Sequence, residues 1–145
     1  MKVMLEPYLT RAKLCIVSKK ESLADCRAFF KGRIDILPVD TTTKNKILLT
    51  LDEACANAII HGNCCDENQF VTIDFTAYKN KLEITIKDNG SMLVNTSEHL
   101  DKTMESVIKN KQKGGMGLKL MHSIMDDIVY FSEEKRNICK MTKAY

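Results

Sequence analysis

Several stretches of the chain alternate apolar and polar residues, which is the pattern of strands with one buried face. One stretch spans residues 11–17, and two more, 71–75 and 82–86, lie on either side of a short turn at 78–81. Apolar residues return near the end of the sequence, at 129–131 and again at 138–142. The pattern therefore predicts one strand, then an antiparallel hairpin, and finally a closing hairpin.

Apolar residues at helical spacing predict helices between these strands. Residues 18–21, Ser-Lys-Lys-Glu, have the sequence of a capping box, so a first helix is expected to begin there and to stop near Gly32. A second helix is expected from about residue 44 to residue 61. Asp40 and the threonines after it are its candidate N-caps, and Gly62 is its candidate C-cap.

A polar-rich segment at 91–113 separates the central hairpin from a third helix, which is expected to begin at Gly117. Inside the polar segment some residues do recur at helical spacing, namely Leu100, Thr103, Met104, Val107 and Ile108. We expect this segment to be a mobile lid. The apolar positions assigned to the third helix are Leu118, Met121, Ile124, Met125 and Ile128.

The length of 145 residues suits one domain, 1–145, because no internal repeat or linker divides it. With 44% hydrophobic and 28% charged residues, the chain is too apolar to be disordered, and its strands and helices should pack in two layers. A formal charge of +3 is too small to indicate nucleic acid binding. The sequence contains neither a membrane-spanning apolar run nor a signal peptide, so a cytoplasmic protein without a membrane partner is expected.

The six cysteines show no paired CxxC spacing, which argues against a zinc site. The neighbours Cys64 and Cys65 are poorly placed for a structural disulfide. His61 lies close enough to them to suggest a metal, but a fourth ligand is lacking. Reduced thiols are the expected state.

The first candidate site lies within residues 51–62, where Glu53 and Asn57 are four positions apart. On a helix they lie almost above one another, away from the apolar face. An amide oxygen and a carboxylate one turn apart suit magnesium and phosphate chemistry, since Asn offers Mg²⁺ a neutral oxygen and Glu can deprotonate a nucleophile. Taken alone, the pair is more often a solvated polar stripe, since E-x-x-x-N is common on exposed helix faces.

The second candidate site is the end of the strand that runs into Asp88-Asn89-Gly90. Gly90 permits a sharp turn, and Asp88 at a fixed strand end can accept a hydrogen bond from an exocyclic amino group such as that of adenine. By itself the tripeptide is only a turn signal.

The third candidate site is a glycine loop that leads straight into a helix. It comprises Lys113, Gly114, Gly115, Met116, Gly117 and Leu118. Unpaired backbone N–H groups and the positive end of the helix dipole favour an anion there, and glycine lets the backbone approach it closely. The loop is neither a Walker loop nor a GxGxxG fingerprint.

In this order the three segments resemble the N, G1 and G2 boxes of the GHKL ATPases. Within that superfamily the chain most resembles the bacterial anti-sigma factor serine kinases. The resemblance rests on Glu-Ala-Cys-Ala-Asn-Ala-Ile-Ile-His-Gly at 53–62, Asp-Asn-Gly at 88–90 and Gly-Gly-Met-Gly-Leu at 114–118. Asp126 or Asp127, Tyr130 and Asn137 continue it.

The resemblance implies a Bergerat-type α/β (α+β) two-layer sandwich, with a mixed, mainly antiparallel sheet covered on one face by about three helices. It implies ATP under a lid at about 91–113, Asn57 on Mg²⁺ and Asp88 on adenine. Glu53 would be the base that activates a serine or threonine hydroxyl. Gly90 and residues 113–118 would complete the nucleotide site, with Lys113 steadying the phosphates.

The chain departs from the family pattern at two positions. Met92 replaces the second glycine of D-x-G-x-G, and its side chain could alter the lid hinge or the nucleotide contact. Lys113 stands where relatives often carry arginine, so the charge is kept but the planar, bidentate fork is lost.

The main hypothesis is an ATP-binding anti-sigma factor that phosphorylates a STAS-type anti-anti-sigma protein and sequesters a sigma factor. One alternative is a partner-binding switch without productive kinase activity. Another is a detached histidine kinase catalytic domain, although the chain lacks room for a dimerising hairpin and His122 lies within a predicted helix. Homodimer formation is left open.

Overall fold

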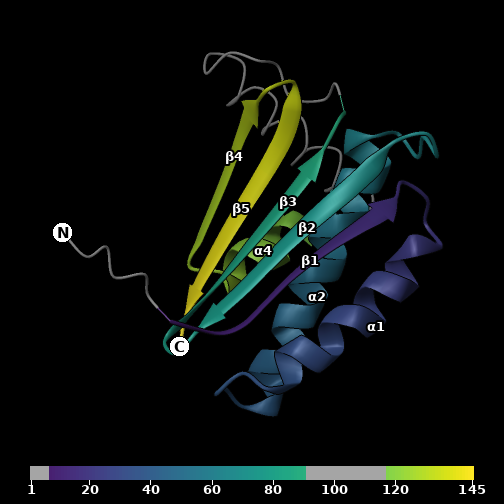
Figure 1. Ribbon diagram of the computed structural model, residues 1–145. Helices are drawn as coiled ribbons and strands as arrows, with labels where there is room; N and C mark the ends of the chain where they lie inside the picture. Colours follow the sequence, from purple (N-terminus) through teal and green to yellow (C-terminus); the bar gives the residue numbers. More distant parts are fainter. Residues whose placement is uncertain (1–6, 91–116) are drawn as a thin grey trace.

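The computed structural model describes residues 7–90 and 117–145, which form a five-stranded sheet with helices packed on one face (Figure 1). The elements in chain order are β1 (Tyr8–Val17), α1 (Ser22–Asp35), α2 (Thr41–Asn57), the π-helical turn η1 (Ala58–Gly62), β2 (Phe70–Tyr78), β3 (Lys81–Asp88), α4 (Gly117–Ile124), β4 (Asp127–Glu133) and β5 (Arg136–Ala144). The predicted lid at 91–113 lies outside the described residues.

The sheet has the strand order β1-β2-β3-β5-β4, and every neighbouring pair is antiparallel. The central hairpin β2–β3 and the closing hairpin β4–β5 confirm the two predicted hairpins. The closing hairpin turns at Glu134 and Lys135, both with positive φ. Because β5 lies between β3 and β4, the end of β3 is next to the start of β5.

The core lies between the sheet and the helices. Alternate residues of β2 and β3, such as Ile73, Phe75 and Ile84, are fully buried, as are Phe30 of α1 and Leu51 of α2. Figure 1 shows α1, α2 and α4 on the same side of the sheet. The predicted α/β two-layer sandwich with a mainly antiparallel sheet is therefore confirmed.

The predicted capping box at 18–21 is wrong, because α1 begins only at Ser22 and Glu21 makes no side-chain cap hydrogen bond. Ser18 is instead buried and its hydroxyl accepts a hydrogen bond from the side chain of Asn63. The predicted stop at Gly32 is also wrong, since α1 continues to Asp35.

The third predicted helix is shorter than its apolar pattern suggested. It ends at Ile124, and Ile128 lies in β4. The helix and the strand that follows it both direct apolar residues toward the core, so Ile128 of β4 continues the apolar spacing of the helix by chance. No helix in the described part of the chain is long and apolar enough to cross a membrane.

The second predicted helix is α2, and its N-cap is confirmed. The side chain of Asp40 accepts a hydrogen bond from the backbone N–H of Thr43 at 2.7 Å. At its other end α2 widens into the π-turn η1, in which the N–H of Asn63 donates to the carbonyl of Ala58 at 2.8 Å. This change of helix type positions the residues of the candidate site.

Candidate functional site

Asp88 ends β3 and lies at the centre of a buried polar group of atoms. Its Oδ1 accepts hydrogen bonds from the backbone N–H of Gly90 and from Nδ2 of Asn137, both at 2.8 Å. The same Asn137 amide also donates to the carbonyl of Gly90 at 2.9 Å. Asn137 is the second residue of β5 and pairs with Asp88 in the register of β3 and β5. This pairing brings together two side chains that are 49 positions apart. These contacts fix the direction of the Asp88 carboxylate.

Two glycines make this arrangement possible, because there is no space for a side chain at either position. A Cβ on Gly62 would lie 2.5 Å from Oδ2 of Asp88, and a Cβ on Gly90 would lie 1.7 Å from the carbonyl oxygen of Gly62. Neither glycine has a positive φ. The helical segment does end at Gly62, but this glycine is needed for its close approach to Asp88 rather than for a left-handed backbone.

The π-turn η1 explains why Gly62 reaches Asp88. A π-turn contains more residues per turn than an α-helix and often occurs at functional sites. Here it directly follows Asn57, the last residue of α2, and ends at Gly62. The two left-handed residues Cys64 and Cys65 then reverse the chain toward β2.

Asn63 joins three strands at this end of the sheet, a role that the sequence did not reveal. Its Nδ2 donates to Oγ of Ser18 at 2.5 Å and to the carbonyl of Phe70 at 3.1 Å. Its Oδ1 accepts from the backbone N–H of Asn89 at 2.9 Å. No local pattern in the sequence distinguishes Asn63 from its exposed polar neighbours in the turn.

Burial raises the pKa of the Asp88 carboxyl group above its usual value, and the hydrogen bonds from Gly90 and Asn137 oppose that shift only in part. A carboxylate kept in such surroundings at neutral pH is costly unless it has a further partner. Perturbed carboxyl groups of this kind are enriched at functional sites.

Asn57 lies where α2 packs against α4. Its Nδ2 is 3.8 Å from the sulfur of Met121, and its Oδ1 is buried without a hydrogen-bond partner among the described residues. A buried amide oxygen without a donor is an acceptor available to a cation or a ligand. The neutral oxygen is of the type that Mg²⁺ binds, so this residue fits the ion.

Glu53 lies one helical turn before Asn57 and is partly exposed. Leu118, in the first turn of α4, is buried. Gly117 is the first residue of α4, whereas Lys113, Gly114, Gly115 and Met116 lie outside the described residues, as does Met92. The described contacts therefore join Asp88, Gly90, Gly62 and Asn137 as one group and connect Asn57 to α4.

Comparison with known families gives a match across most of the chain. The model of the histidine kinase-like ATPase domain matches residues 16–143. This range contains α2, η1, the Asp88 end of β3 and the whole of α4.

The curated relatives include an anti-sigma F factor of Clostridium perfringens (strain SM101 / Type A), which is 29% identical over 129 residues, covering 87% of this chain and 89% of that protein. An anti-sigma F factor of Geobacillus sp. (strain WCH70) is 31% identical over 130 residues, covering 89% and 86%. The serine-protein kinase RsbW of Bacillus subtilis (strain 168) is 30% identical over 83 residues, covering 55% and 52%.

Proposed function

Since the chain belongs to the histidine kinase-like ATPase family, we propose that it binds ATP and Mg²⁺ at the Asp88 end of the sheet and acts as an anti-sigma factor with serine/threonine kinase activity. Its substrate in this proposal is a STAS-type anti-anti-sigma protein, and its second partner is a sigma factor. The names of its relatives, anti-sigma F factor and serine-protein kinase, support this choice within the family.

The fixed carboxylate of Asp88 is the observation that carries the nucleotide proposal. Gly90 and Asn137 both bind Oδ1, whereas Oδ2 accepts no hydrogen bond from the described residues. In our proposal Oδ2 accepts the hydrogen bond from the exocyclic amino group of adenine. A base without that amino group would leave a buried carboxylate unpaired, which is a strong basis for selectivity.

At the phosphate end, Asn57 Oδ1 would hold Mg²⁺, whose charge would offset that of the phosphates. Glu53, one turn away, would accept the proton of the substrate hydroxyl. Residues 113–118 would bind the phosphates through their backbone N–H groups, with the charge of Lys113 beside them. These roles at 113–118 rest on the sequence.

A partner-binding switch without phosphotransfer is the second candidate. It is favoured by Met92, which replaces a glycine of the family motif, and by Lys113, which lacks the bidentate fork of arginine. In this case ATP would bias which partner is held.

Incubation with γ-labelled ATP, Mg²⁺ and candidate STAS proteins from the same genome distinguishes the two. The kinase proposal expects label on a serine or threonine of one candidate. Glu53→Gln should reduce the labelling rate by at least about 100-fold while ATP binding persists, because only the base is lost. Glu67→Gln, which changes an exposed turn carboxylate, is the matched control and should label normally.

A separate binding measurement tests the metal assignment. Asn57→Ala should weaken ATP binding in the presence of Mg²⁺. The ATP affinity of this variant should then depend little on the Mg²⁺ concentration. If ATP binds and a sigma factor is captured but no candidate is labelled, the switch replaces the kinase. If the unmodified protein failed to bind ATP at all, both the kinase proposal and the switch would be rejected.

A further inference from the structure

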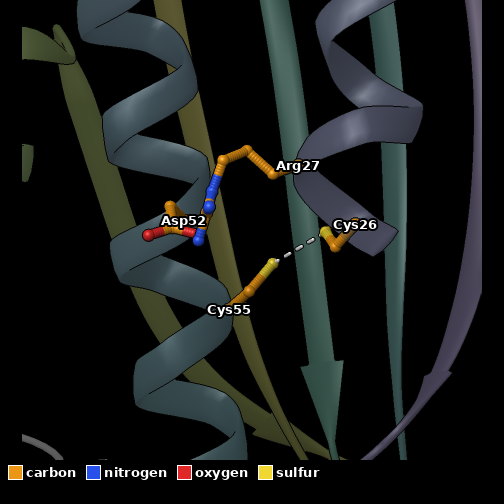
Figure 2. A network of polar contacts seen from close by, with 4 residues as sticks. All are labelled: Cys26, Arg27, Asp52 and Cys55. Atoms are coloured by element: carbon orange, nitrogen blue, oxygen red, sulfur yellow. Dashed lines mark hydrogen bonds and ion pairs between the residues drawn. The ribbon is translucent and has the colours of Figure 1, made fainter. Parts of the chain in front are cut away.

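Two thiols meet in the core between α1 and α2. Cys26 and Cys55 are 2% and 0% exposed, and their sulfur atoms are 3.6 Å apart. Figure 2 shows the two sulfurs pointing toward one another from the facing sides of the helices. They are the two buried members of the six free cysteines, of which Cys15, Cys64 and Cys65 are exposed.

The separation is close to that needed for a covalent bond. A disulfide has an S–S length of about 2.05 Å, so the sulfurs would have to approach by roughly 1.5 Å. The two cysteines are 29 positions apart in the sequence, and a bond between them would close a long loop. No other described pair of cysteine sulfurs makes such a contact.

The two sulfurs have different chemical environments. The hydrogen bond with Cys55 lowers the pKa of the Cys26 thiol, and this effect outweighs burial, which raises it. A thiolate is the nucleophile in thiol oxidation. The sulfurs lie 3.6 Å apart, so whichever of the two is oxidised has the other in place to resolve the product, and the lowered pKa favours Cys26 as the first to react.

The position of Cys55 connects this pair to the site described above. It lies on α2 midway between Glu53 and Asn57, two residues from each. A covalent bond to α1 would hold this turn of α2 and draw it toward α1.

We propose that Cys26 and Cys55 form a modification site, at which a peroxide oxidant creates an internal disulfide that ties α1 to the turn of α2 bearing Glu53 and Asn57. The effect of this bond on ATP binding rests on the proposed function. Formation of the bond does not.

The chemistry has two steps when hydrogen peroxide is the oxidant. The Cys26 thiolate attacks one peroxide oxygen, the O–O bond breaks, and the second oxygen leaves as hydroxide, which takes up the proton released by the thiol. Cys26 is then a sulfenic acid. The Cys55 sulfur attacks the Cys26 sulfur and displaces its hydroxyl, which leaves as water with the Cys55 proton. Two thiols become one disulfide, and peroxide is reduced to two waters.

An ion pair lies beside the thiols, and our proposal includes that it slows the access of oxidant to them. Arg27 follows Cys26 on α1, and Asp52 lies three residues before Cys55 on α2. Nη2 of Arg27 is 3.1 Å from Oδ1 of Asp52, so the ion pair joins the same two helices (Figure 2). Their side chains are 50% and 26% exposed, so the pair lies nearer the surface than the two buried sulfurs. Small oxidants reach such thiols when the helices separate locally.

The test uses a variant in which the three exposed cysteines are replaced, Cys15→Ser, Cys64→Ser and Cys65→Ser. Three of the six thiols then remain, those of Cys26, Cys55 and Cys139. After peroxide and alkylation under denaturing conditions, the number of free thiols should fall from three to one. Peptide mapping should recover a disulfide between the peptides of Cys26 and Cys55, and dithiothreitol should restore all three thiols.

The oxidised protein should also unfold at a temperature higher by up to roughly 10 °C, because the loop between the two cysteines is closed. Adding Cys55→Ala should abolish both the disulfide and this rise. If that variant fails to fold, peptide mapping of the parent still decides. Three free thiols after treatment, a disulfide involving Cys139, or sulfinic acid at Cys26 would each overturn the proposal.

Two further measurements test what the proposal implies for the rate of oxidation and for ATP binding. Arg27→Ala with Asp52→Ala removes the ion pair and both of its opposing charges, and should speed oxidation several-fold. Lys31→Ala with Asp35→Ala, which removes an exposed pair within α1, is the matched control and should not. Equal rates in both variants would reject the ion pair as the barrier.

ATP should bind the oxidised form several-fold more weakly than the reduced form, because the bond displaces the turn that carries Asn57. Unchanged affinity would reject this regulatory effect while leaving the disulfide itself established. Absence of ATP binding by the reduced protein would instead reject the proposed function, so the two failures are distinguishable.

Discussion

At the scale of single residues, Gly62 and Asp88 are in such close contact that a methyl group cannot fit between them. Gly62 in η1 and Gly32 in α1 have very different surroundings, so the same substitution at both positions gives a test and its control. A Cβ at position 62 would lie 2.5 Å from the Asp88 carboxylate, whereas a Cβ at position 32 would meet no atom within 4 Å.

Gly62→Ala should therefore destabilise the protein by about 2 kcal/mol, the usual cost of overpacking a rigid site, and should weaken ATP binding at least tenfold. Gly32→Ala should stabilise it by about 0.5–1 kcal/mol, because alanine loses less backbone entropy in an exposed helix. Urea unfolding and ATP titration measure both effects. Equal behaviour of the two variants would contradict the close contact at Gly62.

The buried Asp88 carboxyl group predicts a pH dependence. Burial raises its pKa in the folded state above the unfolded value, so the native carboxylate costs stability at pH values above the folded pKa. This cost disappears as the pH falls through the folded pKa toward the unfolded one. Asp88→Asn keeps an acceptor for Gly90 and Asn137 but removes the charge.

Asp88→Asn should accordingly be more stable than the unmodified protein at pH 7, and the difference should narrow as the pH is lowered. Urea unfolding over a series of pH values provides the measurement. ATP affinity should fall at least tenfold in the same variant, because the side chain no longer presents a carboxylate to adenine. Asp127→Asn, at an exposed carboxylate, should show neither effect.

At the scale of secondary-structure elements, the side chain of Asn63 connects the end of η1 to β1, β2 and β3. Asn63→Ala removes all three hydrogen bonds and leaves a buried Ser18 hydroxyl without its donor. The expected cost is about 2–3 kcal/mol. Asn68→Ala, in the exposed turn that follows, should change stability by less than about 0.5 kcal/mol. Chemical denaturation that showed no difference between them would reject this role.

The elements that were predictable from sequence are those with a regular apolar period. The strands of both hairpins follow from alternation, and the N-cap at Asp40 follows from its side-chain chemistry. The start of α1 was not predictable, because Ser18 has the chemistry of a cap but its hydroxyl is bound by Asn63, 45 positions away. The π-turn η1 was not predictable either, because it adds residues to a helical turn without altering the local composition.

The sequence singles out residues of the candidate site one by one, but it does not reveal how they are arranged. Asp88, Gly90 and Asn57 each carry a local signal. The contact of Gly62 with Asp88 and the bond from Asn137 depend on how distant segments pack, which local patterns do not encode. The predicted start of the third helix at Gly117 is confirmed, whereas the phosphate-binding roles of residues 113–118 remain predictions.

At the scale of the whole molecule, the strand order determines which contacts can form early during folding. The hairpins β2–β3 and β4–β5 join neighbouring segments, whereas β1–β2 and β3–β5 join segments that are far apart in the chain. Closing such long loops costs entropy before any contact compensates for it, and this slows folding.

The bond from Asn137 to Asp88 belongs to the distant kind, since the two residues meet only once β5, already paired with β4 in the closing hairpin, has paired with β3. A partly folded chain with only its local hairpins lacks the bond from Asn137 that orients the Asp88 carboxylate, and in our proposal it would not recognise adenine. If the proposal holds, nucleotide capture would report completion of the sheet, and a chain that holds ATP would be one whose folding has finished.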